Sequence, residues 1–185
     1  HGVSELLVSV PDYSGLFACI TSILDEMGLD VMSARVLTTN KGWSYDLFQL
    51  MDQHGEVINE IDAAELVRRL EQATSEQKPR APIKRTVPRR LRHFYGTADI
   101  HFTQDPDHAG SVLHIRCSDR PGLLSRIAAA LYSQGAQVHN ARIATFGERV
   151  EDTFLISDMD HQPLDSGTRE ALVESLKNHI DEGKG

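Results

Sequence analysis

Several features are scarce in this sequence, and each scarcity excludes a class of protein. The two cysteines, Cys19 and Cys117, stand too far apart for a close-spaced metal knuckle, and their apolar surroundings are typical of buried thiols. No apolar run approaches the roughly 18 residues of a membrane span, and the start at His1 shows neither an initiator Met nor a signal peptide. We therefore expect a soluble, cytoplasmic piece of a longer protein, with no metal site and no membrane contact.

Catalytic signatures are also missing. None of the nine histidines is followed by Asp, and the sequence contains no P-loop, nucleophile elbow or HExxH motif. His139, Asn140 and Arg142 fall on one predicted strand, so they do not converge as a base and its orienting partner. The sequence predicts no catalytic residue and no cofactor for this chain.

The amounts of apolar and charged residues, 40% and 25% of 185 residues, are those of an ordinary globular protein with one large or two small domains. Residues 78–92 hold seven of the 19 cations together with three prolines. The rest has 12 cations against 27 acidic residues, a formal charge of −15. The prolines indicate a basic linker over residues 78–97, and the acidic remainder argues against a nucleic-acid partner.

The chain contains an internal repeat. Residues 12–20 match residues 119–127 at an offset of 107, and the match continues to Ala34-Arg35 and Ala141-Arg142. After the loss of one residue in a turn, Asp46 and Phe48 match Asp152 and Phe154. We therefore predict two copies of one domain, over residues 1–77 and 98–185.

Each copy shows the same succession of periodic segments. Alternating apolar residues predict a first strand, and a helical stripe that ends at a glycine predicts the helix after it. A hairpin and a second helix follow. The predicted hairpins and second helices span residues 31–52 and 61–72 in the first copy, and 138–158 and 166–180 in the second. A further strand at 98–104 completes either the first copy or the second.

This order is that of an α+β, ferredoxin-like βαββαβ domain, in which two helices pack on one face of an antiparallel sheet. Many unrelated functions use this fold, so it does not identify a chemistry by itself. The sequence therefore predicts two such domains, with antiparallel sheets that carry helices on one face, and it leaves open whether the two copies pair with each other.

The turn between the first strand and the first helix is the best candidate for a binding site. In each copy an Asp precedes a glycine turn, and the helix begins directly after it. Unpaired N–H groups at such a helix end suit a carboxylate, while a neighbouring Asp suits an ammonium group. The same residues also suit a structural role in which Asp caps the helix and Gly permits the turn. The candidate residues are Asp12, Gly15 and Leu16 in the first copy, and Asp119, Gly122 and Leu123 in the second.

Alternation along the strand at 138–146 sends Ala141 and Ile143 to the face under the helices and leaves Asn140 and Arg142 on the other face. Asn140 could hydrogen-bond a ligand held by a neighbouring domain. A solvated asparagine on an open sheet face is the alternative.

Each repeat resembles the ACT domain, an amino-acid-binding regulatory module, most clearly over Asp119-Arg-Pro-Gly-Leu-Leu-Ser-Arg-Ile127. Leu91-Arg-His-Phe94 and residues 141–154 are similar to the C-terminal region of the bacterial bifunctional PII uridylyltransferase and uridylyl-removing enzymes. This likeness covers nearly the whole chain.

The resemblance implies a regulatory role. In that family a nucleotidyltransferase domain, which would use Mg, uridylylates the nitrogen-regulatory PII protein, and an HD-type domain removes the UMP. The tandem ACT region senses glutamine. The implied partners are glutamine, the catalytic domains of the same polypeptide and, through them, PII. ACT domains also pair edge to edge, within a chain or as a homodimer.

When the motif of the family is matched to this sequence position by position, the resemblance implies ligand contacts at Asp119, Gly122, Leu123 and Asn140. The first copy departs from the pattern, with Tyr13-Ser14 in place of Arg120-Pro121 and with Ser33 in place of Asn140.

Two alternatives remain open from the sequence. One is a free-standing tandem ACT regulator that acts on transcription. The other is a ferredoxin-like RNA-binding module that uses the basic linker, although such modules carry stacking aromatics on the sheet and this chain is only 6% aromatic.

Overall fold

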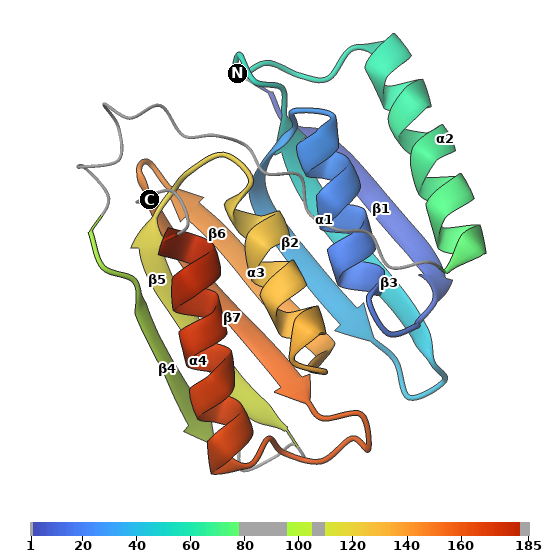
Figure 1. Cartoon of the computed structure of the whole chain (residues 1–185). Coiled ribbons are helices and arrows are strands. Elements are labelled where there is room, and N and C mark those ends of the chain that lie inside the picture. Colours follow the sequence, from blue (N-terminus) through green and yellow to red (C-terminus); the bar gives the residue numbers. More distant parts are fainter. Residues whose placement is uncertain (1, 78–95, 105–109, 182–185) are drawn as a thin grey trace.

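The computed structural model describes residues 2–77, 96–104 and 110–181. These residues form one antiparallel sheet of seven strands with helices on one face (Figure 1). The strands are β1 Ser4–Pro11, β2 Asp30–Thr38, β3 Trp43–Met51, β4 Asp99–Gln104, β5 Ser111–Ser118, β6 Gln137–Phe146 and β7 Arg149–Ser157. The helices are α1 Leu16–Glu26, α2 Glu60–Glu76, α3 Leu123–Ser133 and α4 Ser166–Asp181. Most of the predicted linker, residues 78–95, lies outside the described residues.

The two copies join edge to edge inside one chain. The strand order is β1-β3-β2-β6-β7-β5-β4, so β2 of the first copy pairs with β6 of the second. At the centre of this pair Arg35 stands opposite Arg142, its own counterpart in the repeat. An internal twofold axis therefore relates the copies. The ferredoxin-like fold is confirmed. The edge-to-edge pairing that the family resemblance implies occurs within the chain, where β2 and β6 join the two copies into one sheet.

The strand predicted at 98–104 lies beside the second copy. β4 pairs with β5, with Ile100 opposite Ile115, and forms that edge of the sheet. The second copy thus has four strands, and the first contributes three. Among the described residues β1 is the other edge.

The helices follow from the apolar stripes that the sequence shows. α1 is buried along almost its whole length because it lies between α2 and α3 (Figure 1). α2 lies at the margin of the helix layer, so it buries only Leu66 and Leu70, while Val67 of the predicted stripe is exposed. None of the helices in the described part of the chain is long and apolar enough to cross a membrane.

One hydrophobic core runs through both copies. Phe17 of α1 packs edge-on against Phe154 of β7, with ring centroids 6.0 Å apart, and so links the first copy to the second. Aromatic pairs of this geometry contribute about 0.5 to 1.5 kcal/mol beyond the area that they bury. This shared core fixes the end of α1 against the start of α3, where the candidate site lies.

Candidate functional site

The turns that precede α1 and α3 have the same backbone structure. The N–H of Leu16 donates to the carbonyl of Tyr13, and the N–H of Leu123 donates to that of Arg120, each at 3.1 Å. Gly15 and Gly122 have φ values of +90° and +73°, as the third position of a type II turn requires. The expectation that Leu16 and Leu123 offer free N–H groups was therefore wrong, because the turn itself uses both donors.

Other donors remain at the start of α3. Neither helix has a side-chain cap, so the alternative in which Asp12 and Asp119 cap their helices is also wrong. Within the described residues, the N–H groups of Gly122, Leu124 and Ser125 have no protein acceptor. The positive end of the α3 dipole is therefore available to an anion.

Of the two turn aspartates, Asp12 is half-buried and Asp119 is exposed. Burial raises the pKa of both Asp12 and Asp119, and the N–H of the following residue, Tyr13 or Arg120, partly offsets this rise. The N–H of Asp119 donates to the carbonyl of Glu148 at 2.8 Å and ties the turn to the hairpin between β6 and β7. Asp119 is therefore held in place beside the start of α3.

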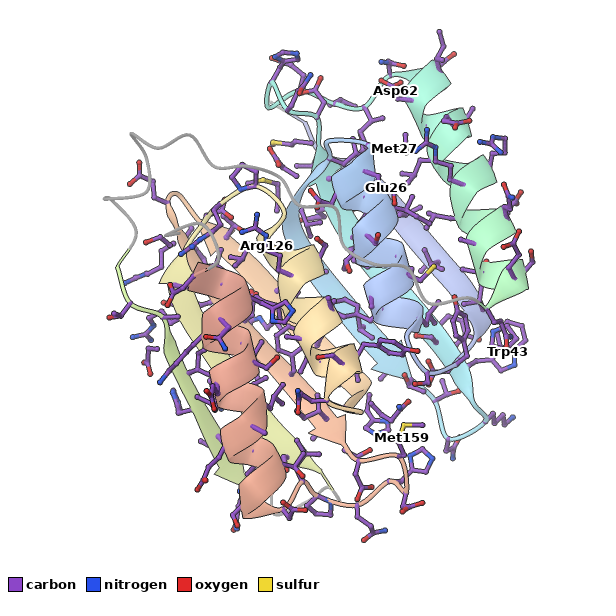
Figure 2. The ribbon with its side chains drawn as sticks, viewed as in Figure 1. Glu26, Met27, Trp43, Asp62, Arg126 and Met159 are labelled. Atoms are coloured by element: carbon purple, nitrogen blue, oxygen red, sulfur yellow. The ribbon has the colours of Figure 1, made fainter. Side chains whose placement is uncertain are left out.

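A cavity of about 210 Å³ lies beside the start of α3 and has walls from both copies. The second copy supplies Asp119, Gly122 and Leu123, and the first supplies Asp25 from the last turn of α1. Figure 2 shows Arg126 near the start of α3 at the same end of the molecule as Glu26 of α1 and Met27, which follows this helix. The structure thus brings three of the candidate residues together in one pocket.

The corresponding place in the first copy is almost filled. A pocket of only about 20 Å³ adjoins Asp12, Gly15 and Leu16. A Cβ atom on Gly15 would lie 2.8 Å from Cε2 of Tyr132, so the tyrosine ring covers this glycine. The first candidate site is therefore closed.

Asp25 and Tyr132 occupy corresponding positions, 107 residues apart in the repeat. Asp25 faces Gly122 as Tyr132 faces Gly15, since a Cβ atom on Gly122 would lie 2.9 Å from Oδ2 of Asp25. The same oxygen accepts a hydrogen bond of 3.0 Å from the Ser125 hydroxyl. A short carboxylate at this position leaves the second pocket open, whereas an aromatic ring fills the first.

Asn140 does not join the other candidate residues. It is exposed on the sheet face opposite the helices, paired with Leu37, while its neighbours Ala141 and Ile143 are buried under the helices. It lines neither pocket, because both pockets lie on the helix side of the sheet. The predicted alternation is correct, and it is the reason why Asn140 points away from the site.

Asp152 of β7 lines the open pocket and was not among the predicted site residues. It is 2% exposed, and burial together with the charge of Asp119 raises its pKa to about 8. The sequence held a signal for it, because Asp152 interrupts an alternating series of buried apolar residues that includes Val150 and Phe154.

Comparison with known proteins identifies the second copy. The ACT domain family matches residues 111–173, from β5 into α4. The match covers most of the second copy, which therefore resembles an ACT domain. A solved structure of aspartate kinase from Synechocystis covers 95% of the chain and 27% of its own length, with a TM-score of 0.50 and 15% identity. That likeness shows the fold alone, and it extends over both copies.

Curated relatives resemble almost the whole chain. A bifunctional uridylyltransferase/uridylyl-removing enzyme of Psychrobacter sp. is 34% identical over 93% of the chain, and one of Xanthomonas axonopodis pv. citri is 40% identical over 93%. The resemblance inferred from the sequence is confirmed. The chain spans about a fifth of the length of these relatives. The identity of these relatives does not favour the alternative of a free-standing regulator of transcription.

Proposed function

We propose that this chain is the amino-acid-sensing regulatory region of a bifunctional uridylyltransferase/uridylyl-removing enzyme, and that glutamine is its ligand. The observation that carries the proposal is the open pocket at the start of α3, which has walls from both copies. The catalytic domains of the same polypeptide would receive the signal, and the PII protein would be their substrate.

The pocket offers a partner to each end of a zwitterion. The N–H groups of Gly122, Leu124 and Ser125 suit the carboxylate of a free amino acid, and Asp119 suits its ammonium group. Half-saturation near ~1 mM requires only about −4 kcal/mol. Two or three charge-assisted hydrogen bonds of roughly 1.5 to 3 kcal/mol each would supply this after the costs of binding.

The lining favours a neutral side chain over an acidic one. Its basic residue, Arg120, directs a guanidinium N–H to the carbonyl of Ile180. A second carboxylate on the ligand would be repelled by the acidic lining, whereas an amide would donate to it. The pocket is lined by four aspartates, Asp25, Asp30, Asp119 and Asp152.

Regulation follows from the position of the pocket between the copies. A ligand that contacts α1 and α3 together favours the arrangement of the two copies in which both contacts are made. It can shift the catalytic domains only by the difference in its affinity for their two states.

Isothermal titration calorimetry of the 185-residue chain with glutamine, glutamate and other amino acids tests this function. We expect glutamine to bind at one site with a dissociation constant in the millimolar range or below, and glutamate to bind at least about tenfold more weakly. Absence of binding by every amino acid at millimolar concentration would refute the proposal.

A further inference from the structure

The carboxyl group of Asp152 forms part of the wall of the open pocket. It lies on the helix-covered face of β7 and is 2% exposed. The N–H of Ala144 donates to its Oδ1 at 3.4 Å, and within the described part of the chain its Oδ2 accepts no hydrogen bond. A buried carboxyl with so few partners is costly unless something else in the pocket satisfies it.

The first copy holds the corresponding acid with a side-chain donor, although Oδ2 of that acid, Asp46, is buried without a hydrogen-bond partner among the described residues. Asp46, the counterpart of Asp152, accepts a hydrogen bond of 2.6 Å from the Ser44 hydroxyl. Val150 stands in place of Ser44 in the second copy, so Asp152 lacks this donor. Burial raises the pKa of Asp46 to about 6 and that of Asp152 to about 8. The second copy therefore lacks the side-chain hydroxyl donor, and it is the copy whose pocket is open.

Asp119 is the other carboxyl that acts on Asp152, since its charge raises the pKa of the buried group. Both residues line the pocket. An ammonium group placed between them would offset their mutual repulsion and supply donors to both. The charged and titratable groups around this place are Cys117, Asp119 and Arg120 near the turn, Asp181 of α4, and Asp25 and Asp30 of the first copy.

We propose that Asp152 is a specificity-determining residue of the pocket, which binds the ammonium group of the amino acid together with Asp119 and releases its proton to solvent as it does so. The inference rests on the proposed function and deepens it. The protonated acid and the ligand cation give a carboxylate–ammonium pair and one free proton, so charge is balanced. A ligand without an ammonium group gains nothing from Asp152.

The pH dependence of binding follows from this exchange. At neutral pH Asp152 holds its proton in the free protein, because its pKa lies at about 8. Binding then has to remove this proton, so affinity for glutamine rises by up to about tenfold for each pH unit between pH 6 and pH 8. Near pH 7 binding releases about one proton per ligand.

Calorimetry with glutamine in two buffers of different ionisation enthalpy measures the released proton directly. In the unaltered chain we expect release of about one proton at pH 7. Asp152→Asn should weaken binding by about tenfold or more and abolish the release. Asp46→Asn is the matched control, because the same change in the closed site should leave both the affinity and the proton release unchanged.

The outcomes separate this inference from the proposed function. If the unaltered chain binds no amino acid, both are refuted. If it binds glutamine without releasing a proton, or if Asp152→Asn binds within about twofold and still releases one, only the role of Asp152 is refuted. The proton measurement on the unaltered chain needs no variant, so a folding defect in Asp152→Asn does not prevent the test.

Discussion

The two copies share a turn, a helix and a twofold axis, yet only one of them has an open pocket. The last turn of α1 lies against the start of α3, and the last turn of α3 lies against the start of α1 (Figure 1). Each copy therefore supplies the residue that faces the other copy's glycine. Asp25 leaves the space at Gly122 open, and Tyr132 covers Gly15. In a duplicated domain, one position on the partner helix is enough to keep one site and close the other.

The two pockets also differ in the hydrogen bonding of the buried aspartate that lines each of them. Asp46 of the closed site accepts a hydrogen bond from Ser44, whereas Asp152 of the open site has a valine at the corresponding place. In the closed site one oxygen of Asp46 has a donor and the other, Oδ2, is buried without a partner among the described residues. The acid of the open site instead lines a cavity that a ligand can enter. Substitutions at these positions should therefore make the open site more like the closed site, or the closed site more like the open one.

The largest effect is expected from Asp25→Tyr, which gives the open site the residue that fills the closed one. The ring would cover Gly122 as Tyr132 covers Gly15, so we expect glutamine affinity to fall by at least about a hundredfold, or roughly 2.7 kcal/mol. Calorimetry measures the loss. Asp25→Asn keeps the size of the side chain and serves as the control. Binding that survives Asp25→Tyr in a folded protein would place the ligand elsewhere.

The two buried acids should affect stability differently as the pH changes. The pKa of Asp152 is raised in the folded state, so its favourable contribution is present below the unfolded pKa near 4 and is lost as the pH rises through about 8. Asp152→Asn should therefore raise the free energy of unfolding relative to the unaltered chain by about 1 to 2 kcal/mol at pH 8, and less at pH 5.

Urea denaturation at both pH values measures this difference, and Asp46→Asn is the comparison. Because the pKa of Asp46 is raised only to about 6, its effect at pH 8 should be smaller. An equal gain from both variants would mean that the missing serine hydroxyl does not distinguish the two sites.

A smaller effect is expected from Tyr132→Ala, which removes the ring from Gly15. The ring is partly exposed, so we expect a loss of only about 1 kcal/mol in the free energy of unfolding. The opened space should then admit a second, weaker glutamine, visible in calorimetry as a second binding event. If the stoichiometry stays at one in a folded variant, the ring alone does not close the first site.

The repeat, the strands and the helices could be predicted because they depend on local periodicity and on glycines at helix ends. Pairing of β2 with β6 could not, since edge-to-edge contact depends on which strands the fold leaves at its margins. The donors of Leu16 and Leu123 were assigned wrongly because a type II turn consumes them. Asp25 and Tyr132 were missed because each acts on the other copy, and the match between copies at offset 107 compares residues that correspond, not residues that touch.

Asn140→Ala should have the smallest effect, although the family resemblance makes this residue a ligand contact. Its side chain is exposed on the open face of the sheet, while the pocket lies under the helices and is lined by its buried neighbour Ile143. We therefore expect glutamine affinity to change by less than about twofold in calorimetry, no more than for Ser33→Ala at the corresponding position. A loss of about tenfold or more would mean that the ligand reaches the open face, and the site would then have to include the surface around β2 and β6 instead of the pocket between α1 and α3.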